Sequence, residues 1–285
     1  MAIKAIMCDI DGTLLTTQGT ISPLTAEAIQ KSREKGILFG ISTGRAITNV
    51  KKLLPQWGIS GMVDAIVGSG GAEIYDYEQD HFEENYPLPG HVIQEIIDHY
   101  KDMDVNFVIH GDGYLYAPKE DENIRNLSAA DQIPYKVIDF DEYLKTSHPK
   151  VMITCDPALM DAVIERGKSF HSKDFRSASL QTTKLLYEYM DPRITKTYGL
   201  KKIMSLHGFS MEELCVFGDA DNDYDMVLNA GVGVAMANGS EKTKKAADYI
   251  TDDNDHDGIG NFIFEHILSY HTTKGSTLRF PLLSL

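Results

Sequence analysis

The chain has 285 residues, 42% of them hydrophobic, and a formal net charge of −15, which is enough apolar material for a folded core in one or two domains. The acidic excess argues against nucleic acid as a partner, because a phosphate backbone is bound by a basic surface, but it leaves small phosphorylated molecules open. The apolar runs are too short to span a bilayer and the N-terminus lacks a signal-peptide pattern, so we expect no membrane association and a cytoplasmic location.

Strands and helices alternate in the first part of the chain. The apolar residues 2–8 predict a strand, and Ser22 followed by Pro23 predicts the start of a helix that ends at Gly36. The next expected elements are a strand at 37–42, a helix with an apolar face at 47–54 and a strand at 65–67. This order predicts a parallel sheet covered by helices on both faces.

Beyond residue 82 the pattern becomes mixed. We expect a helix at 90–101, a hairpin of strands 105–110 and 114–117, a strand at 150–155, a helix at 157–169 and strands near 175–180 and 184–190. The parallel rhythm resumes at Lys196, with helices at 196–207, 223–229, 240–247 and 258–269 and strands at 214–217, 232–236 and 249–250. We expect the apolar end of the tail from Thr272 to pack on the core or on a neighbour.

The fold class predicted from this order is α/β, with a Rossmann-like parallel-sheet core and an inserted α+β domain. We expect the core to comprise residues 1–82 and 191–285, and the inserted domain, which the resemblance described below implies to be a cap, to comprise residues 83–190. Three cysteines, Cys8, Cys155 and Cys215, lie in apolar surroundings without a metal-ligand spacing, so we expect reduced core residues.

Asp9 and Asp11 are the most informative residues, because they end an apolar strand and are followed by Gly12. The carboxyl edge of a parallel sheet is where α/β folds bind ligands. Two carboxylates in a half-buried site repel each other and are costly to desolvate. A hard cation such as Mg²⁺ relieves both costs.

Further polar residues fall at the ends of other core strands. They are Thr43-Gly44-Arg45 after strand 37–42, Lys196 at a helix start, and the run 218–223 with Asp219, Asn222 and Asp223. The acidic run 252–257 matches no calcium-loop spacing, so we expect a solvated loop and helix cap there.

The motifs DxDGT, STGR, a lone lysine and GDxxND, in this order, resemble those of the haloacid dehalogenase superfamily. The runs 231–236 and 246–251 add to the likeness, and the inserted segment makes the chain most similar to the Cof-type phosphatases with a large α/β cap of the C2B type. The resemblance implies a Mg²⁺-dependent phosphatase acting on a small phosphorylated metabolite.

The resemblance also implies roles for individual residues. Asp9 would be the nucleophile that forms an aspartyl-phosphate, and Asp11 the general acid and base whose backbone carbonyl also reaches the metal. Asp219 and Asp223 would complete the metal site. Thr43, Gly44, Lys196 and Asn222 would bind the phosphate, whereas Arg45 could contact either substrate or an interface.

Two other functions remain open at this point. A sugar phosphomutase or phosphotransferase would use the same chemistry on a different acceptor. A non-catalytic receiver-like signalling protein would also combine acids, threonine and lysine around a phosphorylated aspartate, although the length and the insertion speak against it.

Overall fold

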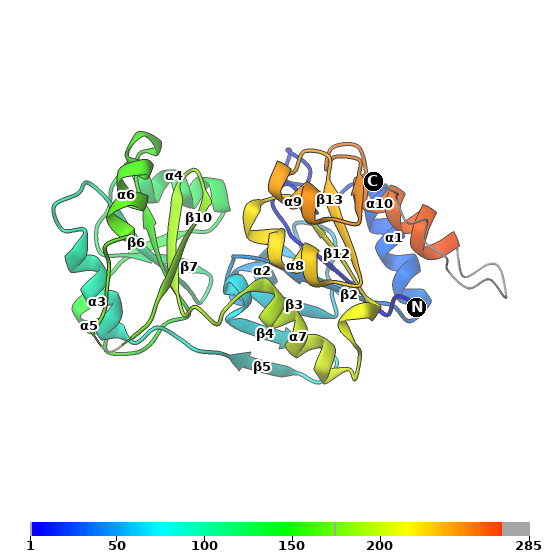
Figure 1. Cartoon of the computed structure of the whole chain (residues 1–285), viewed down its shortest axis with the longest axis horizontal. Helices are drawn as coiled ribbons and strands as arrows, with labels where there is room; N and C mark the ends of the chain where they lie inside the picture. The colour runs from blue at the N-terminus through cyan, green and yellow to red at the C-terminus, as the bar shows by residue number, and fades with distance from the viewer. Residues whose placement is uncertain (1, 174, 270–285) are drawn as a thin grey trace. The chain divides into compact units, whose positions relative to one another are not determined.

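The structure is a computed structural model that describes residues 2–173 and 175–269 (Figure 1). Its larger sheet has eight strands, which in hydrogen-bonded order are β14 (Tyr249–Thr251), β13 (Val232–Met236), β12 (Leu214–Gly218), β1 (Ala5–Cys8), β2 (Leu38–Ser42), β3 (Ala65–Gly68), β4 (Glu73–Asp76) and β5 (His81–Glu84). The smaller sheet has six, in the order β10 (Ala178–Thr183), β11 (Leu186–Met190), β9 (Val151–Thr154), β6 (Asn106–Gly111), β7 (Tyr114–Ala117) and β8 (Tyr135–Val137).

The central part of the larger sheet is parallel. Strand β12 pairs in parallel with β1 and with β13, and β13 pairs in parallel with β14. All residues of β1 and β12 are buried, as expected for strands covered on both faces. At the other end of the sheet, β4 pairs antiparallel with β3 and with β5. The predicted α/β class with a parallel-strand core is confirmed.

The helices that accompany the larger sheet are α1 (Pro23–Glu34), α2 (Ile47–Leu53), α7 (Lys196–Leu206), α8 (Tyr224–Asn229), α9 (Glu241–Ala246) and α10 (Gly258–Phe262). Helix α1 begins as predicted, because the Ser22 side chain accepts a hydrogen bond from the Thr25 N–H and Pro23 takes the first position. The predicted helix 258–269 divides, since α10 continues as a π-helical segment, Ile263–Leu268.

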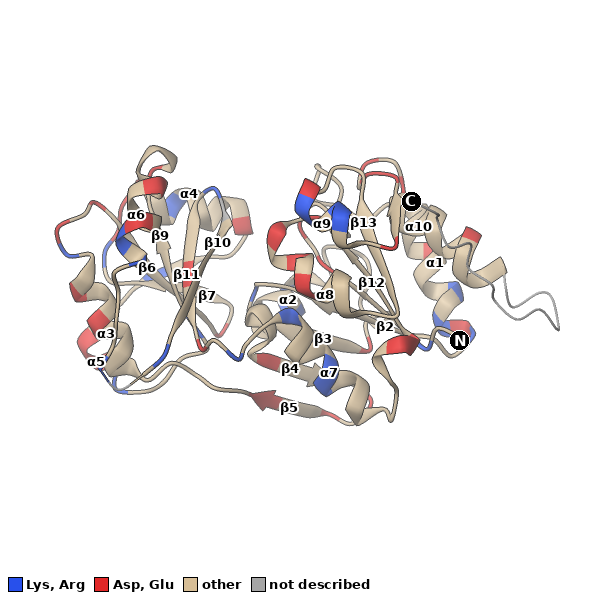
Figure 2. Ribbon diagram, in the orientation of Figure 1, with Lys and Arg blue, Asp and Glu red and all other residues tan. Residues whose placement is uncertain are grey.

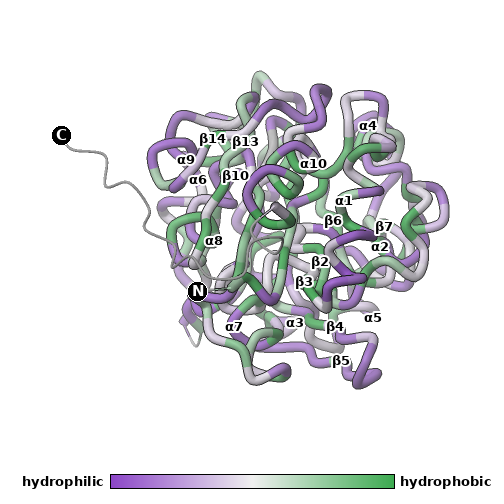
Figure 3. The backbone as a smooth tube through the Cα atoms, turned by 90° about the vertical axis from the view of Figure 1, so that its right-hand side faces the viewer, coloured by the Kyte–Doolittle hydropathy of each residue, from purple (hydrophilic) through white to green (hydrophobic). Residues whose placement is uncertain are grey.

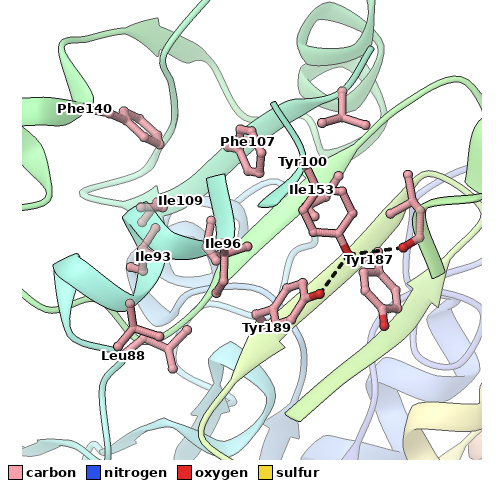
Figure 4. Close-up of a cluster of buried hydrophobic side chains, with 14 of the residues drawn as sticks. Leu88, Ile93, Ile96, Tyr100, Phe107, Ile109, Phe140, Ile153, Tyr187 and Tyr189 are labelled. Atoms are coloured by element: carbon pink, nitrogen blue, oxygen red, sulfur yellow. Dashed lines mark hydrogen bonds between the residues drawn. The ribbon is translucent and has the colours of Figure 1, made fainter. Parts of the chain in front are cut away.

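The six-stranded sheet carries helices α3 (Gly90–His99), α4 (Glu122–Asp131), α5 (Phe140–Tyr143) and α6 (Met160–Gly167). One face holds a large apolar cluster with α3, α5 and α6, in which the Tyr100 hydroxyl donates to the Val163 carbonyl (3.1 Å) and shares a hydrogen bond with the Tyr189 hydroxyl (2.8 Å; Figure 4). The other face packs Val108 and Met152 against Ile124 and Leu127 of α4.

The chain forms two compact units. Of the described residues, the first contains 2–40, 61–64 and 204–269, and the second contains 41–60, 65–173 and 175–203. Hydrophobic residues run along strands such as β2 and β3, whereas hydrophilic residues colour much of the outer loops (Figure 3). Acidic and basic residues are interspersed on helices and loops (Figure 2). Among the described residues, no helix is both long and apolar enough to cross a membrane.

Several elements differ from those predicted. Helices α4 and α5 and strands β4, β5 and β8 form where no element was predicted. Lys184, expected inside a strand, lies in the turn between β10 and β11.

The three cysteines are buried free thiols, as predicted. The predicted packing of the tail from Thr272 lies outside the described residues.

Candidate active site

The turn after β1 carries Asp9 at the carboxyl end of this central strand of the larger sheet. The Asp9 N–H donates to the Phe217 carbonyl of β12 (3.0 Å), and its carbonyl accepts from the Leu14 N–H (3.2 Å). The backbone therefore reverses within five residues, through Gly12 at φ +82°. Asp9 itself is only 7% exposed.

The loop after β12 presents two more acids. Asp223 is fully buried, and one of its carboxylate oxygens accepts hydrogen bonds from the N–H groups of Asp219 (3.0 Å) and Ala220 (2.9 Å). Gly218 makes this turn possible, because a Cβ there would lie 2.6 Å from the Cβ of Asp223. Two backbone donors on one oxygen hold the Asp223 carboxylate in a fixed orientation.

Asp9, Asp219 and Asp223 come together from these two loops. Each offers a carboxylate oxygen, and the three atoms lie within 4.8 Å of one another. The Thr13 hydroxyl donates to Asp219 Oδ1 at 2.6 Å, so that the DxDGT turn is joined to the acidic loop directly. Gly12 permits this approach, because a Cβ there would lie 2.6 Å from Asp219 Oδ2.

A third loop, between β13 and α9, supports both of the others, and sequence reasoning did not find it. The Asn238 side-chain amide donates to the Gly12 carbonyl (2.8 Å), and the Ser240 N–H donates to the Asp219 carbonyl (2.7 Å). The Thr243 hydroxyl donates to the Ala220 carbonyl (2.7 Å). The sequence signal was present at Ser240, which caps the α9 helix through the Thr243 N–H.

The three acids fit a hard divalent cation. Like charges this close repel strongly when partly desolvated, and oxygen ligands suit Mg²⁺. The Asn222 Oδ1 atom adds a second indication, because it is buried without a hydrogen-bond partner among the described residues. Asp11 lies outside this group of three and is exposed. Asp221 is exposed as well and accepts from the Ser240 hydroxyl.

Cys8, next to Asp9, stays protonated. Burial, with further contributions from the charges of Cys215 and Asp9, raises the pKa of the Cys8 thiol well above its ordinary value. The residue is therefore a buried thiol and no competing nucleophile beside the acids.

Thr43, Gly44 and Lys196 belong to the second unit. Thr43 and the residue before Lys196 both contact the glycine pair 70–71. The Thr43 carbonyl accepts from the Gly70 N–H (3.0 Å). Gly71, at φ +112°, packs against the start of α7 so closely that a Cβ there would lie 2.0 Å from the Thr195 carbonyl oxygen. Thr43 is 2% exposed and Lys196 3% exposed.

Arg45 is buried in the same unit. Its guanidinium donates to the Asp131 carbonyl at the end of α4 (2.7 Å), and its backbone carbonyl accepts from the Ser69 N–H. Both of these hydrogen bonds lie within the second unit. The acidic run 252–257 is a loop before α10, in which His256 pairs with Asp253 (2.7 Å).

Comparison with known proteins decides the family. The model of the haloacid dehalogenase-like hydrolases matches residues 6–263. The chain belongs to this family. It is 28% identical over 263 residues to the 5-amino-6-(5-phospho-D-ribitylamino)uracil phosphatase of Bacillus subtilis, covering 92% of this chain and 96% of that one.

A second curated relative and a solved structure are also similar to this chain along most of its length. A pyridoxal phosphate phosphatase of Escherichia coli is 26% identical over 275 residues, covering 94% of this chain and all of its own. The crystal structure of a haloacid dehalogenase-like hydrolase from Bacteroides thetaiotaomicron superposes with a TM-score of 0.82 at 25% identity, over 92% of this chain and 98% of that one. The chain is thus an enzyme, a phosphatase of the haloacid dehalogenase type.

Proposed function

We propose that this enzyme is a Mg²⁺-dependent phosphatase that hydrolyses monoesters of small phosphorylated metabolites through an aspartyl-phosphate. The observation that carries the proposal is the meeting of Asp9, Asp219 and Asp223 at the ends of two neighbouring parallel strands. The backbone of Asp9 is held by hydrogen bonds to Phe217 and Leu14. A carboxylate at such an edge, flanked by two other acids, is suited to attack a phosphorus atom once its charge repulsion is relieved.

In the proposed first step, a carboxylate oxygen of Asp9 bonds to phosphorus while the bond from phosphorus to the leaving oxygen breaks. Asp11 donates its proton to that leaving oxygen, so the product departs as a neutral alcohol. In the second step, Asp11 takes a proton from water, and the water oxygen bonds to phosphorus. The bond between phosphorus and Asp9 breaks, which releases inorganic phosphate and restores both carboxyl groups.

The carboxylates of Asp9, Asp219 and Asp223, together with the backbone carbonyl of Asp11, would hold Mg²⁺. When bound, the ion supplies positive charge that offsets the acids and the phosphoryl oxygens. We propose that Thr43, Gly44, Lys196 and Asn222 bind the phosphate, Thr43 by its hydroxyl and Lys196 by its ammonium group.

The relatives support a proposal for the substrate class. Two of them act on phosphorylated metabolites of small size, an aminouracil with a phosphoribityl chain and pyridoxal phosphate. We propose a substrate of comparable size, and we assign residues 83–190 to a cap domain inserted into a core of residues 1–82 and 191–285. A cap of this kind excludes water from the first step.

The first test is hydrolysis of p-nitrophenyl phosphate with Mg²⁺ and with a chelator. We expect steady turnover that requires Mg²⁺ and disappears in Asp9→Asn, because the amide is no nucleophile. The matched control is Asp104→Asn, whose side chain is 97% exposed and which should keep wild-type activity. Wild-type turnover in Asp9→Asn would refute the assigned nucleophile, provided circular dichroism shows that both variants are folded.

Product analysis tests the two alternatives. A phosphomutase or phosphotransferase would return the phosphoryl group to a sugar and release little inorganic phosphate. A receiver-like protein would become phosphorylated once and stop. Stoichiometric release of inorganic phosphate over many turnovers contradicts both.

A further inference from the structure

A buried ion pair lies in the second unit, next to the loop that carries Thr43. Lys150 Nζ donates to Glu188 Oε2 at 2.8 Å, and the two side chains are 3% and 4% exposed. Lys150 immediately precedes β9, and Glu188 lies on β11, which pairs with β9 in antiparallel register. Desolvating two charges is costly, so a pair buried this deeply needs further hydrogen bonds to be tolerated.

The pair makes two further hydrogen bonds, and one of them reaches the loop that carries Thr43. The Lys150 ammonium also donates to the Gly44 carbonyl at 2.8 Å. The other oxygen of Glu188 accepts from the Thr182 hydroxyl at 3.0 Å. The Gly44 carbonyl is thus held by a fixed positive charge.

That carbonyl shares one peptide plane with the Arg45 N–H, because the peptide unit is rigid and trans. The Arg45 N–H donates to the Thr43 Oγ1 atom at 3.2 Å. The peptide is therefore held at both ends, at its oxygen by Lys150 and at its N–H by Thr43. A hydroxyl has one hydrogen and two acceptor positions, so an oxygen that accepts here keeps its own hydrogen to donate.

We infer that Lys150 is a positioning residue that orients the Thr43 hydroxyl through the Gly44–Arg45 peptide, with Glu188 holding the ammonium in place. The inference rests on the proposed role of Thr43 as a phosphate ligand. Lys150 touches neither phosphate nor Thr43 in this assignment. Its effect is carried by one peptide plane and one hydrogen bond.

The neighbouring contacts favour a fixed loop. The Arg45 guanidinium donates to the Asp131 carbonyl at the end of α4, where a helix dipole favours positive charge. Burial acts to raise the pKa of Asp131, but its contact with His110 and the charges of Arg45 and Lys150 outweigh burial and hold it below the ordinary value. Of two successive loop residues, Gly44 is thus bound to the buried Lys150 ammonium and Arg45 to the backbone at the end of α4.

The test replaces both charges at once, since removing one would leave the other buried and unpaired. Lys150→Met with Glu188→Gln should lower kcat/KM for p-nitrophenyl phosphate about 10- to 100-fold, the loss associated with a misplaced contact. The matched control is Lys145→Met with Glu142→Gln, an exposed pair at 2.6 Å whose side chains are 66% and 70% exposed. The control should leave kcat/KM unchanged.

A double-mutant cycle with Thr43→Val separates positioning from general damage. If Lys150 acts through the Thr43 hydroxyl, the charge-pair replacement should cost less than 3-fold once that hydroxyl is absent. Equal losses in the two backgrounds would overturn the inference. If the pair replacement does not fold, Lys150→Arg takes its place in the same cycle, because it keeps the charge beside Glu188 and changes the reach to Gly44.

A failure of the proposed function can be distinguished from a failure of the positioning role. A wild-type protein without turnover would refute the phosphatase assignment, and the cycle would then be measured by calorimetric binding of inorganic phosphate with Mg²⁺. The positioning role is supported if the pair replacement weakens phosphate binding in the wild-type background but leaves it unchanged in the Thr43→Val background. Unchanged binding in the pair variant contradicts it.

Discussion

The three clustered acids differ, residue by residue, in how their oxygens are occupied. One oxygen of Asp223 accepts two backbone N–H groups, whereas Asp219 accepts the Thr13 hydroxyl. Such bonds fix the direction of a carboxylate. Asp223 therefore anchors the loop as well as contributing charge, and a substitution there should disturb the backbone more than one at Asp219.

His148 provides a test of pH dependence at the residue scale. It is 7% exposed, and its ring stacks on Tyr143 with centroids 4.4 Å apart. Burial lowers the pKa of His148 below 6.5, against the opposing effect of its hydrogen bond to the Tyr143 carbonyl. The unfolded chain thus binds a proton at a higher pH than the folded one, and stability falls as pH drops through 6.5.

The slope from this single group is at most about 1.4 kcal/mol per pH unit. Urea unfolding at pH 7.5 and at pH 5.5 should show a smaller loss of stability in His148→Gln than in the wild type. His91→Gln, at an exposed position of α3, is the control and should lose as much as the wild type. Parallel losses in all three proteins would contradict the assignment to His148.

Sequence reasoning found the clustered acids because the motif order placed them at the ends of neighbouring parallel strands, where the fold brings them together. It did not find Lys150 or Glu188. Their link to Gly44 joins residues 106 positions apart, and it depends on the register between β9 and β11. A single sequence carries no signal for that register.

At the scale of elements, the turn that follows β1, from Asp9 to Leu14, depends on Gly12. Gly12→Ala should lower stability by roughly 1–2 kcal/mol, the cost of a left-handed conformation at a residue with a Cβ. It should also lower turnover, because the new Cβ would lie 2.6 Å from Asp219 Oδ2.

Gly36→Ala is the matched control, since Gly36 has φ +78° but no atom within 4 Å of the added Cβ. Urea unfolding and p-nitrophenyl phosphate turnover should show similar strain in the two variants and a loss of activity in Gly12→Ala alone. Full activity in a folded Gly12→Ala protein would refute the claim that this turn positions Asp219.

The elements predicted from the sequence were those with strong local signals. Helix α1 has a cap and a proline at its start, and the strands β1 and β12 are continuous apolar runs. Helix α4 was missed because only Ile124 and Leu127 of its ten residues are buried. Strand β8, three residues long and at a sheet edge, forms by pairing with β7 and has little pattern of its own.

For the whole molecule, the cluster of Asp9, Asp219 and Asp223 sets the sign of the metal's effect on stability. Folding brings Asp9, Asp219 and Asp223 together from distant parts of the sequence, so part of their repulsion arises only in the folded state. A cation at this cluster would bind the folded chain in preference to the unfolded one. It would stabilise folding by mass action.

Thermal unfolding with and without Mg²⁺ tests this coupling without any substrate. At an ion concentration of 100 times Kd, the wild type should gain about 2.7 kcal/mol of stability and a higher Tm. Asp219→Asn should lose that gain, and its Tm with chelator present should rise above that of the metal-free wild type because one repulsive charge is gone. Asp104→Asn, far more exposed, should behave as the wild type does in both conditions. Equal Mg²⁺ shifts in wild type and Asp219→Asn would place the ion elsewhere.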